Sequence, residues 1–265
     1  MGSYVMAGGL RTYYEQWGSA GEPVILLHGG GVTADTWQAQ GPALAARYRV
    51  LAPERRGHGR TPDVAGPVSY AAMADDTAAF AEALDLGPAR VVGWSDGAAV
   101  GLHLALRRPD LVGRLVVIGA AITRDGDTPA ARALIDDPAG HDMLAGWFRP
   151  LYAPLSPDGP DHFDTVFAKL LAMWAGGSGL TMADLAAITA PTLVMQGDDD
   201  GVRPAHSAEM AAALPDAQLA VVPGTSHALP VEKPDLVNGL LMDFLAERQP
   251  PKLLGMSGET ITSGW

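Results

Sequence analysis

Apolar and polar residues alternate in two different patterns along this chain. Short runs of Val, Ile, Leu, Met and Ala are flanked by glycine, proline or charged residues, which is typical of buried strands. Between them, apolar residues recur every three to four positions, as on one face of a helix. The strand pattern covers residues 24–27, 49–52, 89–92, 115–118, 192–195 and 219–222, and the helical pattern covers 36–47, 70–84, 98–108, 204–214 and 234–248.

Strands without a polar side are expected in a sheet that is covered on both faces. Because such strands alternate here with helices, the pattern predicts a mostly parallel central sheet flanked by helices, an α/β fold. The exception is the N-terminus, where Gly8 and Gly9 separate residues 4–6 from residues 10–17. Two segments of mixed β propensity around such a turn predict an antiparallel hairpin.

The regular alternation is interrupted between residues 121 and 190, where Pro, Gly and Asp cluster around short helical patterns. We therefore expect a core domain from residues 1–120 and 191–248, an inserted helical cap from 121–190, and an extended tail from 249–265. Apolar residues at helical spacing predict one packed cap helix: Phe163, Val166, Phe167, Leu170, Leu171 and Trp174. Four cap aromatics are candidates to line a substrate pocket: Trp147, Phe148, Tyr152 and Trp174.

Composition narrows the possible partners and compartments. The net charge is −12 with the acids spread along the chain, which disfavours nucleic acid and anionic membrane surfaces. No run approaches the roughly 20 apolar residues of a membrane span. The chain has no cysteine, and residues 1–9 lack a secretory pattern, so a cytoplasmic location is expected. We expect a small-molecule substrate, no nucleic acid and no membrane partner, and the composition leaves the oligomeric state open.

The sequence Gly-Trp-Ser-Asp-Gly at residues 93–97 is the first sign of catalytic chemistry. A strand that turns directly into a helix has no room for side chains two residues before and after the turn residue, so glycines there are a steric requirement. Glycine is common in this chain, 32 of 265 residues, so the motif alone is weak. Its position between a predicted strand and a predicted helix makes Ser95 a candidate nucleophile.

A serine hydroxyl needs a base within hydrogen-bond reach and a third group that orients the base. Three aspartates, at positions 198–200, follow the predicted strand 192–195, and His227 follows the predicted strand 219–222. Because both segments come after carboxyl ends of strands, the edge where open α/β sheets place their sites, they are expected near Ser95.

A glycine-rich segment, residues 28–31, follows the predicted strand 24–27. Attack on a carbonyl creates an oxyanion that needs preorganised donors, and glycines let backbone amides approach it closely. We expect the amides of Gly30 and Asp96 to form this oxyanion hole, with a tight turn without a donor role as the alternative for Gly30. Gly31 and Trp94, beside these groups, are candidate substrate contacts.

Together these segments resemble the α/β-hydrolase family with a helical cap. The resemblance extends to about residue 248 and rests on residues 28–31, 56–61, 93–97, 197–200 and 224–227, in the family's order of nucleophile, acid and histidine. It implies a Ser95–His227–Asp200 triad, because the family pattern Gly-x-x-Asp selects Asp200 before Asp199 or Asp198. Mutual repulsion among the three aspartates predicts that at least one faces solvent.

One residue departs from the common family pattern. Many relatives carry a small or apolar residue after the nucleophile, whereas this chain has Asp96, as do valacyclovir-hydrolase-like esterases. A carboxylate at this position could hold a substrate ammonium group. Alternatively, Asp96 complements the positive end of the following helix or pairs with an arginine.

The expected reaction is hydrolysis of a small ester, lactone or related acyl bond through an acyl-enzyme on Ser95. The same triad would serve a carbon–carbon bond hydrolase or a perhydrolase, and the scaffold would serve a ligand-binding receptor. Epoxide hydrolases and haloalkane dehalogenases are disfavoured because they place an aspartate where Ser95 stands. No histidine pairs at metal-binding spacing and no nucleotide-binding loop occur, so no metal and no cofactor are expected.

Overall fold

The computed structural model describes residues 2–246, which form one eight-stranded sheet with helices on both faces. The strands are β1 (Gly2–Ala7), β2 (Leu10–Trp17), β3 (Pro23–Leu27), β4 (Arg49–Pro53), β5 (Ala89–Trp94), β6 (Val112–Ile118), β7 (Thr192–Asp199) and β8 (Ala217–Ser226). Their order across the sheet is β1-β2-β4-β3-β5-β6-β7-β8. Only the pairs β1–β2 and β2–β4 are antiparallel, which confirms the predicted N-terminal hairpin and mostly parallel sheet.

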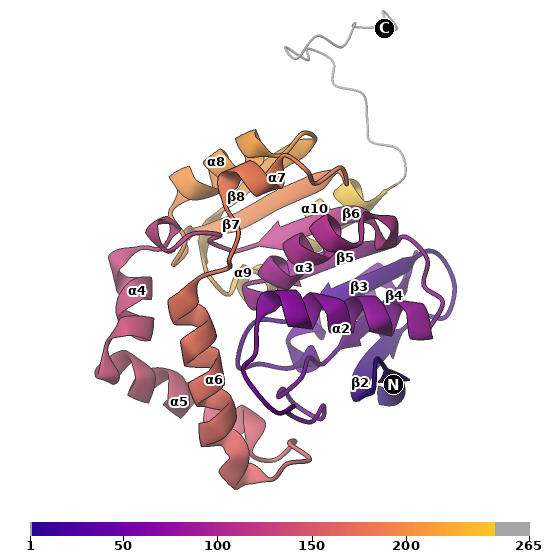
Figure 1. The fold of residues 1–265 in the computed structure, drawn as a ribbon. Helices are drawn as coiled ribbons and strands as arrows, with labels where there is room; N and C mark the ends of the chain where they lie inside the picture. Colours follow the sequence, from indigo (N-terminus) through magenta and orange to yellow (C-terminus); the bar gives the residue numbers. More distant parts are fainter. Residues whose placement is uncertain (1, 247–265) are drawn as a thin grey trace, which may run out of the picture.

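Consecutive residues of the central strands face opposite sides of the sheet, so each strand contributes to two hydrophobic cores. On one side, Ile25 and Leu27 of β3 pack in a cluster that also contains residues of α2 (Tyr70–Ala83) and α3 (Asp96–Arg107). Figure 1 shows these two helices in front of the sheet. On the other side, Val24 and Leu26 belong to a second cluster. These residues are fully buried, which explains why the strands lack polar positions.

The second cluster includes side chains from η1 (Ala34–Trp37), α1 (Gln40–Leu44), α9 (Leu229–Glu232) and α10 (Pro234–Leu245). The sequence predicts one helix over residues 36–47, whereas the structure has only the short turns η1 and α1 there. Pro42 explains the difference, because it has no amide hydrogen for the bond that a continuous helix would need.

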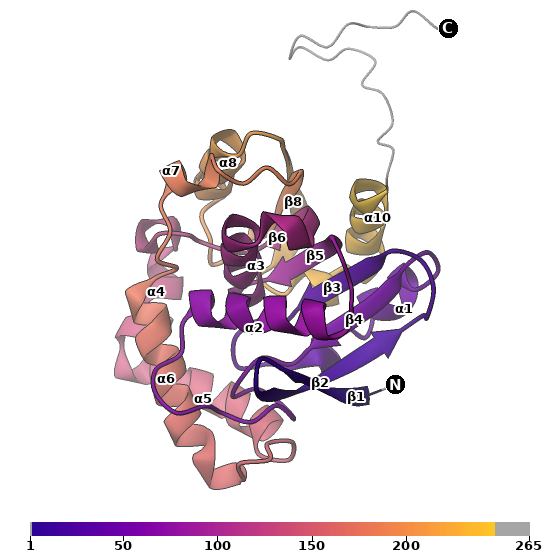
Figure 2. The same ribbon diagram turned by 45° about the vertical axis from the view of Figure 1, so that its right-hand side comes forward.

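A separate lobe of helices follows β6. It consists of α4 (Pro129–Asp136), α5 (Pro138–Tyr152) and α6 (Phe163–Gly176), which lie together to one side of the sheet in Figures 1 and 2. The expected buried side of α6 is present: Phe163, Val166, Phe167 and Leu170 are each at most 8% exposed, and Leu171 and Trp174 are partly buried. We call α4, α5 and α6 the helical lobe.

The remaining elements are short, except α8. They are η2 (Pro109–Leu111), η3 (Arg124–Gly126), η4 (Pro160–His162), α7 (Met182–Leu185) and α8 (Pro204–Ala213). Although α7 belongs to the segment predicted as a cap, it contacts α3 and α8. The expected tail, residues 249–265, lies outside the described residues. Among the helices of residues 2–246, none combines the length and apolar character that a membrane crossing requires.

Candidate active site

Ser95 occupies a strained turn between β5 and α3. Its backbone angles are φ 56° and ψ −120°, a conformation that non-glycine residues rarely adopt, and its amide donates to the Ile118 carbonyl over 2.8 Å. A side chain on Gly93 would collide with the Gly97 carbonyl, and one on Gly97 with the Leu27 carbonyl. Both glycines are therefore required for the turn, as the spacing predicts, and the serine is held at its tip.

The predicted acid and histidine lie beside one another. Asp200 Oδ1 and His227 Nδ1 are 2.8 Å apart, and Asp200 Oδ1 also accepts the Val202 amide over 3.1 Å. Asp200 is 7% exposed, whereas Asp198 and Asp199 are exposed to solvent. The structure thus pairs His227 with the aspartate that the family pattern selects, and mutual repulsion is relieved by exposing the other two.

His227 is held from two sides. The indole Nε1 of Trp94 donates to the His227 carbonyl over 2.8 Å, which ties the histidine loop to the residue before Ser95. Burial lowers the pKa of His227, but the hydrogen bond and charge of Asp200, with the charges of Asp96 and Asp127, outweigh it and raise the pKa above 6.5. Ser95 and His227 line the same cavity, although no hydrogen bond joins their side chains in this structure. Such bonds often tighten only when substrate binds.

The glycine-rich segment 28–31 is oriented by a buried arginine. Arg55 donates from Nη1 to the His28 carbonyl and from Nη2 to the Gly29 carbonyl, the latter over 2.9 Å. Because a trans peptide directs its N–H opposite to its C=O, this arrangement aims the Gly30 amide away from Arg55. Gly29, Gly30, Ser95 and Asp96 line the same cavity. Within residues 2–246 the amides of Gly30 and Asp96 have no acceptor, so both are free to donate to a ligand.

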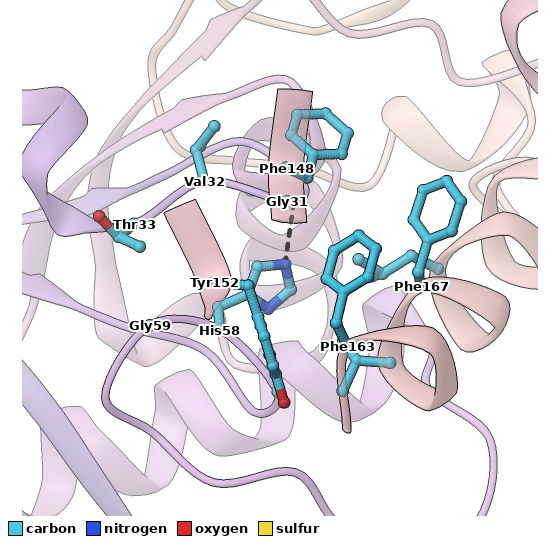
Figure 3. A pocket seen from close by; sticks show the side chains of 12 residues that line it. Gly31, Val32, Thr33, His58, Gly59, Phe148, Tyr152, Phe163 and Phe167 are labelled. Atoms are coloured by element: carbon cyan, nitrogen blue, oxygen red, sulfur yellow. Dashed lines mark hydrogen bonds between the residues drawn. The ribbon is translucent and has the colours of Figure 1, made fainter. Parts of the chain in front are cut away.

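The next amide in the segment is already used. Gly31 donates to Nε2 of His58 over 3.1 Å, the bond drawn in Figure 3, where the Phe148 ring lies beside Gly31. Burial and the nearby charge of Arg55 lower the pKa of His58 to about 3, so this imidazole is neutral and can accept. His58 Nδ1 in turn lies 3.0 Å from the Arg56 carbonyl. Through His58, the segment 56–61 therefore holds the glycine-rich segment in place.

Two of the predicted substrate contacts lie outside the cavity that Ser95 and His227 line, which we call the catalytic cavity for its candidate role. Gly31 and Tyr152 line a separate apolar cavity of about 10 Å³, and neither lines the larger one. Gly31 is covered by the Phe148 ring, because a side chain added to it would overlap that ring. Tyr152 turns toward Phe163, with ring centroids 5.6 Å apart. In this structure neither residue lines the cavity that contains Ser95 and His227, and their contact with substrate stays a prediction.

The catalytic cavity has a volume of about 1010 Å³ and lies between the carboxyl ends of the strands and the helical lobe. On the sheet side it is lined by Trp94, Ser95, Asp200 and His227, among others. The other predicted contacts, Trp147, Phe148 and Trp174, line it from the lobe, together with Met143 and Leu144. Trp147 is 56% exposed, so it lies at the solvent boundary of this cavity. The space is large enough for a small organic molecule.

The Asp96 carboxylate joins the helical lobe to the turn that carries Ser95. Its Oδ1 accepts from the Tyr70 hydroxyl over 2.9 Å, and Trp174 Nε1 lies 3.0 Å from Oδ1 and 2.9 Å from Oδ2. Asp96 is also the first residue of α3, where a negative charge is favourable. Both oxygens already accept hydrogen bonds, and no arginine is among these donors. The structure therefore gives this carboxylate a linking role that the sequence does not predict.

Sequence reasoning overlooks Tyr70, Arg55, Gly119 and Asp127. Gly119 follows β6 with φ +59°, and a side chain there would lie 3.0 Å from Asp200 Oδ2 and 3.1 Å from His227 Nδ1. Its signal in the sequence is a glycine directly after a strand. Arg55 lies one residue before the segment 56–61, and nothing in the sequence distinguishes it from the neighbouring arginine. Tyr70 and Asp127 carry no motif.

Comparison with known proteins identifies the family of this chain. The model of the family described as "Alpha/beta hydrolase family" matches residues 24–240. The chain is 30% identical to the protein named putative carbamate hydrolase RutD of Azorhizobium caulinodans, over 92% of this chain and 98% of that protein. It is 32% identical to a non-heme haloperoxidase of Rhodococcus erythropolis, over 89% of this chain and 96% of the relative.

A solved structure is similar across almost the whole chain. The meta-cleavage product hydrolase CumD of Pseudomonas fluorescens superposes with a TM-score of 0.76 at 27% identity, covering 92% of this chain and 97% of that one. Fold, family model and relatives all agree, and the chain belongs to the alpha/beta hydrolase family.

Proposed function

We propose that this protein is a serine hydrolase that cleaves a carboxylic ester, lactone or related acyl bond in a small molecule. The observation that carries the proposal is the His227–Asp200 pair, 2.8 Å apart, in the same cavity as a serine held at a positive φ. A nucleophile, a base and a group that orients the base are the three parts that acyl transfer through serine requires.

In the proposed reaction, Ser95 Oγ attacks the substrate carbonyl carbon while His227 Nε2 takes the hydroxyl proton. The carbon–oxygen bond to the leaving group then breaks, and His227 returns the proton to the departing alkoxide. Water next gives a proton to His227 and attacks the acyl carbon. The bond from that carbon to Ser95 Oγ then breaks, His227 returns the proton to Oγ, and the acid is released. Asp200 keeps the Nδ1 proton in place and stabilises the imidazolium formed in each half of the reaction.

The amides of Gly30 and Asp96 are proposed to bind the oxyanion. Both lack a protein acceptor within residues 2–246, and the Arg55 bond to the preceding carbonyl fixes the direction of the Gly30 amide. Loss of one such donor typically costs about 10²- to 10³-fold in kcat. The aromatic rings of Trp94, Trp147, Phe148 and Trp174 are proposed as the apolar contacts of the substrate.

The proposal is tested with p-nitrophenyl butyrate and a fluorophosphonate probe. We expect Ser95→Ala to lose at least about 10³-fold in kcat while its unfolding transition stays close to that of the wild type, and to lose labelling by the probe. Ser178→Ala is the matched control, because Ser178 lines the same cavity but its hydroxyl already donates to the Ile122 carbonyl. Full activity of Ser95→Ala, or labelling at another residue, would contradict the proposal.

A carbon–carbon bond hydrolase is the second candidate, and the similarity to CumD favours it. Such an enzyme would use the same triad on a vinylogous diketone. Comparing kcat/KM for a 2-hydroxy-6-oxodienoate with that for p-nitrophenyl butyrate separates the two, since the preferred reaction should be faster by orders of magnitude. Adding hydrogen peroxide to the acyl-enzyme measures a perhydrolase activity in the same assay. Tight binding without turnover of either substrate would instead indicate a receptor.

A further inference from the structure

The catalytic cavity is lined by more negative than positive charge. Its carboxylates are Asp96, Asp127, Asp199 and Asp200, and within the described chain its one guanidinium is Arg124. Arg124 Nη2 lies 2.5 and 2.7 Å from the two oxygens of Asp136, whereas its buried Nη1 has no hydrogen-bond partner within residues 2–246. A ligand in this cavity therefore meets a negative electrostatic field.

These carboxylates differ in what they already bind. Asp96 accepts hydrogen bonds from Tyr70 and Trp174, and Asp200 from His227 and the Val202 amide. Asp199 is exposed to solvent. Asp127, by contrast, is partly buried, and its carboxylate has no hydrogen bond or ion pair within residues 2–246. Of the four carboxylates of the cavity, Asp127 is therefore the one that is partly shielded from water and still has oxygens that accept no hydrogen bond from the described residues.

The backbone of Asp127 is fixed against the loop that carries the catalytic acid. Asp127 forms an isolated antiparallel bridge with Val202, the Thr128 amide donates to the Gly201 carbonyl over 2.7 Å, and the Arg203 amide donates to the Gly126 carbonyl over 2.8 Å. The position of Asp127 relative to the loop after Asp200 is thus set by backbone hydrogen bonds and not by a flexible surface segment.

The charge of Asp127 reaches the catalytic histidine. Burial raises the pKa of Asp127, an effect that the charges of Arg124, Arg132 and His227 oppose, and Asp127 in turn helps raise the pKa of His227. In the proposed reaction, His227 gives its proton to the leaving group, so the alcohol portion of an ester lies next to the His227 ring. Because Asp127 and His227 line the same cavity, a positive charge in the alcohol portion of the substrate would lie in the cavity that Asp127 faces.

Resting on the function proposed above, we infer that Asp127 binds a positively charged group in the alcohol portion of the substrate. The substrate class would then be esters of cationic alcohols, such as amino alcohols or their quaternary forms. A cation at this position would provide the partner that the partly buried carboxylate lacks, and its attraction would be stronger than in bulk water. Asp127, just before α4, would then select substrates by their charge. Asp96 would keep its role of linking the helical lobe to the turn that carries Ser95.

The test compares butanoate esters of choline and of 3,3-dimethylbutanol, which have nearly the same shape and differ in charge. We expect the wild type to prefer the choline ester, and Asp127→Asn to lower the ratio of the two kcat/KM values by about 5-fold or more. Any effect of the substitution on His227 itself changes both esters alike, so the ratio isolates the effect of the substrate charge. Raising the salt concentration should lower the ratio in the wild type and lower it less in Asp127→Asn, where only the other carboxylates of the cavity remain.

Asp125→Asn is the matched control, since Asp125 is in the same turn but exposed and outside the cavity. An unchanged ratio in Asp127→Asn, or an equal change in Asp125→Asn, overturns the inference. Binding of choline and 3,3-dimethylbutanol to the Ser95→Ala protein, measured by calorimetry, gives a second readout that needs no turnover. Ser95-dependent hydrolysis of the neutral ester with no charge preference would contradict this inference alone, whereas absence of any Ser95-dependent hydrolysis would contradict the proposed function.

Discussion

The two walls of the catalytic cavity are held in place by different interactions. The wall at the sheet edge is fixed by hydrogen bonds, among them those from the Ser95 amide to Ile118 and between Asp200 and His227. The wall from the helical lobe is mostly aromatic packing, such as Phe148 against Trp174 with centroids 6.2 Å apart. Directional bonds fix atoms to a narrow position, while apolar packing allows rings to be replaced. We therefore expect changes in the first wall to affect kcat, and changes in the second to affect KM and selectivity.

The largest expected effect that separates the two walls comes from Gly119→Ala. The added methyl group would press on Asp200 Oδ2 and His227 Nδ1 at 3.0 and 3.1 Å, and the residue has φ +59°. Displacing a catalytic group by a fraction of an ångström to 1 Å can cost about 10²-fold in kcat. Gly113→Ala, in the strand β6 that precedes Gly119, is the control, because its nearest contact would be 3.7 Å away. Wild-type kcat in Gly119→Ala, measured with p-nitrophenyl butyrate, would contradict the view that this wall is rigid.

A smaller effect is expected from Trp174→Phe, which removes the indole donor to Asp96 but keeps an aromatic ring. We expect KM to rise about 5-fold, equivalent to about 1 kcal/mol, with little change in kcat. Trp147→Phe is the matched control, since the Trp147 indole makes no hydrogen bond within the described part of the chain. If kcat falls more than KM rises, the lobe positions the Ser95 turn itself, and the division between the two walls fails.

The smallest expected effect is a change in the pH profile. In the proposed reaction His227 must be neutral to accept the serine proton, and its pKa is raised above 6.5, so kcat/KM should fall as the pH drops through a midpoint above 6.5. Removing a negative charge with Asp127→Asn weakens the stabilisation of the imidazolium and should move this midpoint to lower pH. A pH titration of kcat/KM for a neutral ester measures both proteins. A wild-type midpoint at or below 6.5, or a shift upward in the variant, would contradict this account.

The sequence predicts the sheet-edge wall far better than the lobe wall. Ser95, Asp200, His227 and Gly30 could be located because each follows a short apolar strand, and strand ends of a parallel sheet meet at one edge. Helical spacing correctly identifies the buried side of α6. It does not reveal which aromatic ring faces the cavity, because Phe148 and Tyr152 are one turn apart on α5 and only Phe148 lines it.

The residues that sequence reasoning overlooks act through contacts between distant segments. Tyr70 and Asp96 are 26 positions apart, and Trp174 lies 78 positions from Asp96, so no local pattern links them. Asp127 carries no sequence motif. What distinguishes it is that its carboxylate has no hydrogen bond or ion pair within residues 2–246, which only the structure shows. Such features depend on tertiary packing, which a single sequence does not encode in any short-range signal.

The support behind the glycine-rich segment has a consequence for proton transfer. Two imidazoles, His28 and His58, belong to or bond to this segment, and His227 lines the cavity beside it. Burial and Arg55 lower the pKa of His28 far below 6.5 and that of His58 to about 3. These two rings stay neutral from mildly acidic to alkaline solution, and their hydrogen bonds to the segment 28–31 and its surroundings do not change. A proton that the protein gains near neutrality at these three rings is therefore carried by His227, so the segment proposed to bind the oxyanion keeps its hydrogen bonds when His227 ionises.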